Sequence, residues 1–212
     1  ERINEIKSNG TTCAVSITPG KVNELAPIAI DSGIDILVIQ STVTTATYIS
    51  DKESTLILSD LIKQSPIPVI VGNCVTYETA MELIEAGASG LLIGVGPGAA
   101  CTTREVTGVG IPQVTATMNC STARDDYFKK TGKYIPIITD GGIRTGGDIC
   151  KSLVSGADAV MLGTPLAQSS EAPGKGFNWG MASPHPDLPR GTRIDIGTKC
   201  SLKKLLFGPA SV

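Results

Sequence analysis

The sequence is poor in the residues that mark metal centres and membrane segments. His185 is its single histidine, and its six cysteines show no CxxC spacing, so a zinc site is not expected. No apolar run reaches the length of a transmembrane helix, and no signal peptide is recognised at the start. Scattered cysteines are typical of proteins in a reducing compartment. We therefore expect a cytoplasmic protein without a membrane partner.

Neither sign of charge dominates, and aromatic residues are scarce. The 18 Lys and Arg balance 20 Asp and Glu, without runs of either sign, so nucleic acid is not an expected partner. Aromatic residues make up only 4% of the chain, whereas Gly, Ile, Val and Ala are plentiful. This composition is typical of a buried parallel sheet covered by helices.

Apolar runs and helical patterns alternate at intervals of some twenty to thirty residues, which indicates a (β/α) barrel or a doubly wound sheet. In the first predicted helix, Val22, Leu25 and Ile28 share one face. In the third, Thr76 is the expected N-cap. Strands are predicted over 11–18, 34–39, 67–71, 90–95, 111–117, 134–139 and 159–162, and helices over 21–31, 56–62, 76–86, 121–130, 146–154 and 202–207.

Polar and glycine-rich residues follow the predicted strands, and this favours the barrel. Barrel enzymes build their sites from the loops at the carboxyl ends of the strands. No GxGxxG motif opens an early βαβ unit, which weakens the doubly wound alternative. Only about six core strands can be counted, so we expect residues 1–212 to form a partial (β/α)8 barrel that lacks the first strands. No regulatory domain is expected here, and 170–197 is predicted to be an active-site loop region.

A loop with three glycines follows the strand predicted over 90–95. It reads Gly94-Val95-Gly96-Pro97-Gly98-Ala99-Ala100-Cys101-Thr102-Thr103-Arg104. Such a composition predicts a tight loop whose backbone closely approaches a ligand. Most cysteines of reduced proteins are buried hydrophobic residues, but backbone amides at the tip of such a loop can stabilise a thiolate. Cys101 is therefore the candidate nucleophile.

Two carboxylates and two glycine motifs add to the candidate site. Asp140 precedes two glycines and can accept hydrogen bonds from a pair of sugar hydroxyls, although an aspartate that initiates a turn explains it equally well. Glu171 is a lone carboxylate, for which exposure to solvent is the simplest interpretation. The glycines after the last two strands are typical of barrel phosphate sites. Together these features predict a phosphorylated ribonucleotide as ligand and covalent thiol chemistry.

Several segments of the sequence resemble those of a known protein family. The loop 94–104 strongly resembles the catalytic cysteine loop of the IMP dehydrogenase and GMP reductase family. IPIITDGGI over 135–143 resembles its ribose and phosphate segment, and AVMLGTPLA over 159–167 resembles its phosphate segment. EAPG over 171–174 and Gly180-Met181 resemble its acidic and base-contact segments. The closing stretches, 185–196 and 207–212, are most similar to the subgroup called IMP dehydrogenase-related protein type 3.

The resemblance implies a TIM barrel whose cysteine attacks C2 of a purine nucleoside 5′-monophosphate, with NAD or NADP as cofactor. It also implies potassium on backbone carbonyls of the cysteine loop, and homotetramers. The implied catalytic residues are Cys101, Thr103 and Glu171. The implied substrate residues are Asn73, Asp140, Gly141, Gly142, Gly163, Thr164, Gly180 and Met181; Gln40 and Ser41 are implied at the cofactor, and Gly96, Gly98 and Cys101 at potassium.

Two departures from the family bear on the reaction. Gln40 stands where the family usually places an aspartate that contacts the nicotinamide ribose, so cofactor preference is open. The dehydrogenase flap carries an Arg-Tyr pair that activates water, and 183–189 contains no such pair. We therefore favour a GMP reductase-like enzyme, which converts GMP to IMP with release of ammonia. An IMP dehydrogenase, which converts IMP to XMP, and a nucleotide-binding relative without turnover are the alternatives.

Overall fold

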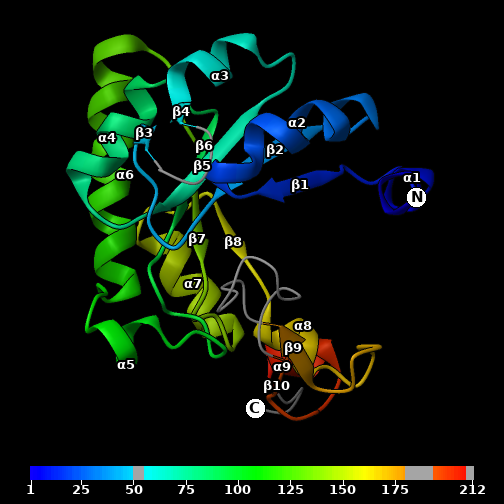
Figure 1. The fold of residues 1–212 in the computed structure, drawn as a ribbon. Coiled ribbons are helices and arrows are strands. Elements are labelled where there is room, and N and C mark those ends of the chain that lie inside the picture. The colour runs from blue at the N-terminus through cyan, green and yellow to red at the C-terminus, as the bar shows by residue number, and fades with distance from the viewer. Residues whose placement is uncertain (50–54, 180–192, 209–212) are drawn as a thin grey trace.

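The computed structural model describes residues 1–49, 55–179 and 193–208, and a curved parallel sheet lies at its centre (Figure 1). Successive strands of the sheet are neighbours, in the order β1-β2-β5-β6-β7-β8. A doubly wound sheet reverses its strand order at a switch point, whereas a barrel does not. The fold is therefore part of a (β/α)8 barrel, as predicted. The strands are β1 (Ala14–Ile17), β2 (Ile36–Gln40), β5 (Val69–Cys74), β6 (Gly90–Ile93), β7 (Ile137–Asp140) and β8 (Ala159–Met161).

Helices cover the convex side of the sheet (Figure 1). They form where the sequence combines an N-cap with an apolar stripe: the hydroxyl of Thr76 accepts a hydrogen bond from Thr79 N, and Ala80, Leu83 and Ile84 are buried. The helices are α1 (Arg2–Ser8), α2 (Val22–Asp31), α3 (Leu58–Gln64), α4 (Tyr77–Glu85), α5 (Thr103–Thr107), α6 (Gln113–Thr131), α7 (Gly146–Val154), α8 (Thr164–Gln168) and α9 (Leu202–Phe207), with a 3-10 turn over Pro19–Lys21.

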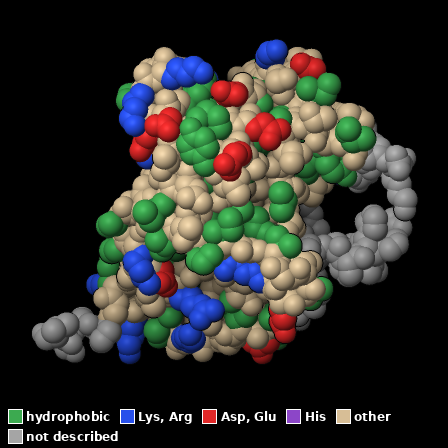
Figure 2. All heavy atoms as spheres, turned by 90° about the vertical axis from the view of Figure 1, so that its left-hand side faces the viewer, with side chains coloured by type: hydrophobic (Ala, Val, Ile, Leu, Met, Phe, Trp, Pro, Cys, Tyr) green, Lys and Arg blue, Asp and Glu red, His purple; other side chains and the backbone are tan. Residues whose placement is uncertain are grey.

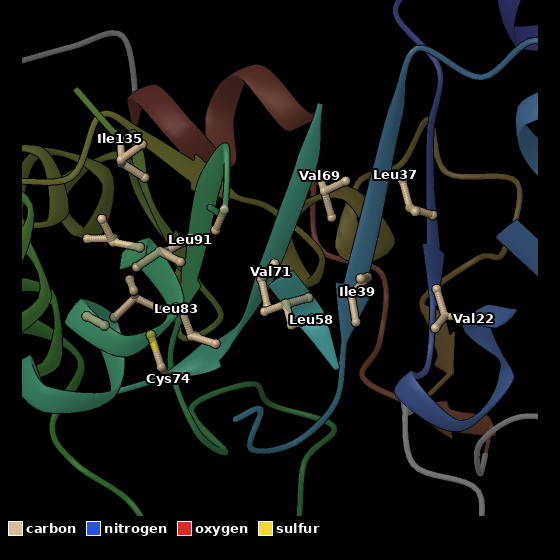
Figure 3. Packing of buried hydrophobic residues seen from close by; sticks show 14 of the residues in the cluster. Val22, Leu37, Ile39, Leu58, Val69, Val71, Cys74, Leu83, Leu91 and Ile135 are labelled. Carbon is tan, nitrogen blue, oxygen red and sulfur yellow. The ribbon is translucent and has the colours of Figure 1, made fainter. Parts of the chain in front are cut away.

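The hydrophobic core lies between the sheet and the helices α2, α3, α4 and α6. Leu37, Ile39, Val69 and Val71 point from β2 and β5 toward the helices (Figure 3) and are almost wholly buried. Each such side chain contributes about 1.5–3 kcal/mol by leaving water. Because side chains alternate along a strand, Val38, Gln40 and Asp140 point to the opposite, concave face. The core thus fixes which residues face the interior of the barrel.

The strand predicted over 111–117 is wrong, because most of that segment forms the first turn of α6. The helix begins after Pro112 and runs for 19 residues, so it also includes the shorter helix predicted over 121–130. Ala116, Cys120 and Ala123 recur at helical spacing and are wholly buried. Packing of α6 against α4 overrides the β propensity of the isoleucine, valine and threonines in the segment.

The predicted buried face of α2 is partly wrong. Val22 is buried, but Ile28 is 62% exposed, and Ala26 and Ala29 face the core in its place. Small side chains let the helix approach the sheet closely, so the apolar stripe is not the set of the largest residues. Pro27 lies inside this helix.

The C-terminal segment forms a separate layer around α8 and α9 (Figure 1). Within the predicted loop region, β9 (Phe177–Trp179) pairs antiparallel with β10 (Arg193–Asp195). Residues 180–192 lie outside the described part. Another short ribbon joins β3 (Thr47–Tyr48) to β4 (Leu56–Ile57), so α3 begins two residues later than predicted.

The face that carries α4 and α6 bears acidic and basic side chains together (Figure 2). Hydrophobic side chains lie between them (Figure 2). Val114 and Met118 of α6 are exposed to solvent. In the described ranges, no helix has both the length and the apolar character needed to cross a membrane.

Candidate active site

Three polar side chains from distant parts of the chain meet at the carboxyl end of the sheet. Gln40 and Asp140 are the last residues of β2 and β7, and Asn73 is the penultimate residue of β5. Nε2 of Gln40 donates to Asn73 Oδ1 at 3.0 Å and to Asp140 Oδ2 at 2.9 Å. Nδ2 of Asn73 donates to the same Asp140 oxygen at 2.9 Å. Parallel strands that end at one edge produce this cluster, which is where barrels place their active sites.

A register shift in β5 makes the cluster possible. The pairing of β5 with β6 is irregular between Gly72 and Cys74. Cys74 belongs to the core on the convex side, while its neighbour Asn73 reaches Asp140 on the concave side. Such an irregularity changes which way a side chain points.

Burial of the Asp140 carboxyl group opposes its ionisation, whereas its hydrogen bonds favour the ionised form. Burial raises the pKa of Asp140, while the amides of Asn73 and Gln40 act in the opposite direction and leave a net increase. Both amides bind Oδ2, and within the described ranges no hydrogen bond reaches Oδ1. Oδ1 is therefore free to accept hydrogen bonds from a ligand.

The cysteine loop is braced by Arg104. Its Nε donates to Val95 O at 2.9 Å, and its Nη2 donates to Ile111 O at 2.6 Å. A Cβ at Gly110 would lie only 2.6 Å from Arg104 Nε, so only glycine allows this close approach. Arg104 thus ties the end of β6 to the segment that leads into α6. The sequence motif contains Arg104, but no role was predicted for it; the nearby glycines are the signal that could have suggested one.

The cysteine loop packs directly on the loop that follows Asp140. An added Cβ at Gly141 would lie 2.8 Å from Pro97 Cγ and 3.3 Å from Gly98 N. Gly141 has φ +89°, a value that other residues rarely adopt. Pro97 also lies beside Gly142. The thiol loop and the carboxylate loop therefore form one structural unit.

Gln113 closes this unit from the helix side. Its Nε2 donates to Ile93 O at 2.5 Å and to Asp140 O at 3.2 Å, and so it links the ends of β6 and β7. Its Oε1 is buried and has no hydrogen-bond partner among the described residues. Sequence reasoning missed Gln113, since its segment was expected to be a strand.

Cys101 is exposed and lies just before α5. Its thiol donates a hydrogen bond to Thr103 Oγ1 at 3.2 Å. Its backbone N donates to Gly98 O at 3.0 Å, which closes a tight turn. The structure thus brings together two of the three predicted catalytic residues, with a hydroxyl beside the thiol that can relay a proton.

Glu171, the third predicted catalytic residue, has its partners in the C-terminal layer. Both carboxylate oxygens accept from Leu202 N at the start of α9, at 3.2 and 3.3 Å, and Ser170 Oγ also donates to it. Hydrogen bonds from its own backbone amide, from Ser170 and from Leu202 hold the pKa of Glu171 below its ordinary value. Glu171 lines a hollow of about 550 Å³ together with Phe177 and Leu202, away from the cysteine loop.

The remaining predicted residues are distributed as follows. Gly163 and Thr164 form the turn from β8 into α8, and a Cβ at Gly163 would meet no atom within 4 Å. The hydroxyl of Ser41 lies 2.5 Å from Val43 O and 2.8 Å from Thr44 Oγ1. Gly180 and Met181, predicted at the base, lie outside the described residues. Among the described residues, no cluster of histidine, cysteine or carboxylate side chains could hold a metal ion.

The fold and this edge define a barrel protein with a thiol and a carboxylate at the carboxyl ends of its strands. The IMP dehydrogenase / GMP reductase domain matches residues 4–182. The chain belongs to this family. A similar solved structure is the IMP dehydrogenase/GMP reductase-like protein from Corynebacterium glutamicum, with TM-score 0.83, 37% identity, and coverage of 100% of this chain and 55% of that one.

Two curated relatives show how far the similarity extends. An uncharacterized oxidoreductase of Mycobacterium tuberculosis is 40% identical over 209 residues, which is 97% of this chain and 56% of the relative. The GMP reductase of Leishmania major is 44% identical over 153 residues, or 72% of this chain and 30% of the relative. The chain spans about half the length of the M. tuberculosis relative and less than a third of the L. major enzyme.

Proposed function

We propose that the full-length protein is an oxidoreductase that acts at C2 of a purine nucleoside 5′-monophosphate and converts GMP to IMP with release of ammonia. The packing of the cysteine loop on the Asp140 loop, through Pro97 and Gly141, carries this proposal. It holds an exposed thiol and a carboxylate with a free oxygen at one edge of the sheet. Membership of the family supports a purine nucleotide as the ligand.

The chemistry assigned to this chain is a covalent adduct. The Thr103 hydroxyl, which lies within hydrogen-bond distance, takes up the proton of the Cys101 thiol as it donates its own toward the exocyclic amino group, and the thiolate adds to C2 of the purine. The protonated amino group then leaves as ammonia. A reduced nicotinamide cofactor, NADH or NADPH, would supply the hydride to C2 when bound, and C2 then releases the thiolate to give IMP. We assign Glu171 as a second proton-transfer group. In that role its carboxylate must give up the hydrogen bond that it accepts from Leu202 N.

The ligand is held by the other predicted residues. Asp140 accepts from the ribose hydroxyls through Oδ1, and Asn73 lies beside it. Backbone amides at Gly142, Gly163 and Thr164 bind the phosphate, as barrels do after their last strands. The base is assigned to Gly180 and Met181, which lie outside the described residues. Carbonyls of Gly96, Gly98 and Cys101 remain candidates for potassium, and Gly98 O already accepts from Cys101 N.

We favour GMP reduction over IMP oxidation because the two reactions need different catalytic groups. A dehydrogenase must hydrolyse its adduct, which needs a general base beside an activated water. Expulsion of ammonia needs only proton transfers of the kind that Thr103 can assist. An IMP dehydrogenase stays the second candidate, because the enzyme of that name from Cryptosporidium parvum is 44% identical over 73% of this chain. The cytoplasmic location and the homotetramer belong to this proposal too.

Reaction with an electrophilic purine nucleotide, 6-chloropurine riboside monophosphate, tests the proposed site. Intact-mass and peptide analysis should locate one adduct on Cys101, and excess GMP should suppress it. The exposed Cys150 of α7 is the internal control and should stay unlabelled. Labelling of both cysteines alike, or labelling that GMP does not suppress, would contradict the proposal.

A further inference from the structure

The side-chain amide of Gln40 has only one orientation that fits its neighbours. Its Nε2 faces two acceptors, Asn73 Oδ1 and Asp140 Oδ2, and its Oε1 accepts from Ser16 Oγ at 3.1 Å. A reversed amide would place an oxygen against both acceptors. Ser16 lies on β1, the neighbouring strand. The amide is thus held from three sides, by residues of β1, β5 and β7.

All hydrogen bonds of this cluster run in one direction. Ser16 donates to Gln40, Gln40 donates to Asn73 and Asp140, and Asn73 donates to Asp140. The chain of donors ends at Asp140 Oδ2, which accepts from both amides. The two amides also prevent rotation of the carboxyl group, since both bind the same oxygen.

We propose that Gln40 is a positioning residue that, together with Asn73, fixes the Asp140 carboxylate so that Oδ1 alone faces the ribose hydroxyls of the nucleotide. This inference rests on the proposed function, in which Asp140 receives those hydroxyls. Both Nε2 protons of Gln40 and one lone pair of its Oε1 are engaged by protein groups, so we assign its effect on the ribose to the carboxylate that it holds. Its role therefore differs from direct binding of the cofactor, which the resemblance implied.

A network of neutral amides suits this task better than charged partners. An arginine or lysine beside Asp140 would compete with the ligand for both oxygens, since each offers several donors. Among the described residues, the groups that determine the pKa of Asp140 besides burial are Asn73 and Gln40, both uncharged. Neither partner carries a charge that would neutralise the carboxylate, and hydrogen bonds from hydroxyls to an ionised acceptor are about twice as strong as neutral ones.

The test compares ligands that differ only in their ribose hydroxyls. Dissociation constants for GMP and for its 2′,3′-dideoxy analogue are measured by calorimetry on the full-length protein and on the Gln40→Met variant, which keeps the length of the side chain but removes its amide. We expect Gln40→Met to weaken GMP binding about tenfold and to change binding of the dideoxy analogue less than twofold. Gln64→Met, an exposed glutamine of α3, is the matched control and should alter neither.

A second variant covers the case in which Gln40→Met does not fold. Ser16→Ala leaves Gln40 in place but removes the donor that orients its oxygen, so it should produce a smaller loss that is again confined to GMP. Equal losses for both ligands, or no loss in either variant, would overturn the inference. Equal affinity of the unaltered protein for GMP and the dideoxy analogue would also overturn the inference. If the unaltered protein does not bind GMP at all, the proposed function itself fails, and the inference fails with it.

Discussion

Gln40 Nε2 lies 2.9 Å from Asp140 Oδ2, although the two residues are 100 positions apart in the chain. The contact exists because β2 and β7 end at the same edge of a curved sheet, with β5 and β6 between them. It connects the fold to the candidate chemistry, since one partner orients the carboxylate that we assign to the ribose.

Replacement of Cys101 by alanine should abolish turnover and leave nucleotide binding intact. The thiol is the only group that we assign to bond formation, so the loss of rate should reach several orders of magnitude, whereas GMP affinity should change less than threefold. Steady-state assays and calorimetry measure the two effects. Cys150→Ala, at another exposed cysteine, should behave as the unaltered protein does. Activity retained in Cys101→Ala would remove the central residue of the proposed site.

Replacement of Asp140 by asparagine should stabilise the protein at neutral pH while it weakens nucleotide binding. Burial raises the pKa of Asp140 above its ordinary 3.8, so the ionised carboxylate costs stability at pH values above the folded pKa. Below 3.8 the carboxyl is protonated in both states, and this cost disappears. The Tm of Asp140→Asn should therefore exceed that of the unaltered protein at pH 7, and the difference should narrow as pH falls toward 3.8.

The effect of Asp140→Asn on nucleotide affinity is measured separately from its effect on stability. Loss of a charged acceptor for the ribose costs about 1.5–3 kcal/mol, which is roughly 10- to 150-fold in affinity. Asp148→Asn is the control. Asp148 completes the capping box of α7 with the N-cap Thr145, and hydrogen bonds from Lys151, Arg144 and Thr145 hold the pKa of Asp148 below its ordinary value in spite of desolvation. Asp148→Asn should lower the Tm at pH 7 and leave GMP affinity unchanged. A lower Tm in Asp140→Asn would contradict the assigned cost of burial.

Replacement of Arg104 by lysine should loosen the cysteine loop. A lysine cannot reach Val95 O and Ile111 O at once, and the lost hydrogen bonds from a charged group are worth about 1.5–3 kcal/mol. We expect a lower Tm and at least tenfold slower adduct formation at Cys101, measured by mass spectrometry over time. Arg2→Lys on the exposed surface of α1 is the control. An unchanged rate of adduct formation would show that the brace does not position the thiol.

Replacement of Gly141 by alanine should separate the two loops of the site. A Cβ there meets Pro97 Cγ at 2.8 Å, and φ +89° is unfavourable by about 1–2 kcal/mol for a residue with a side chain. Thermal melting should show this loss, and GMP affinity should fall. Gly147→Ala in α7 has no close neighbour nearer than 3.6 Å and should instead gain about 0.5–1 kcal/mol. Equal stability of the two variants would refute the tight packing of the loops.

The order of elements could be predicted from the sequence, whereas some of the packing could not. The helix predicted over 146–154 coincides with α7, because capping residues and glycines mark its ends. The helix α6 was missed at its start because Ile111, Val114 and the threonines have β propensity, and only packing on α4 reveals the helical period of Ala116, Cys120 and Ala123. Local propensity does not contain that tertiary information.

The candidate site, too, could be predicted from the sequence only in part. Cys101 and Asp140 were found from the glycines around them, since a backbone that closely approaches a ligand needs glycine. The hydrogen bonds of Ser16 and Gln40 join strands that are distant in the sequence, so no local motif records them. They depend on the register of neighbouring strands, which only the folded sheet determines.

The most direct test of the central claim is a spectrophotometric assay of the full-length protein at 340 nm. GMP is supplied with NADPH or NADH in one set of cuvettes, and IMP with NAD or NADP in another. We expect the absorbance to fall with GMP, with one ammonia released per cofactor oxidised, and to stay constant with IMP. A steady rise with IMP and no change with GMP would contradict the claim and identify a dehydrogenase.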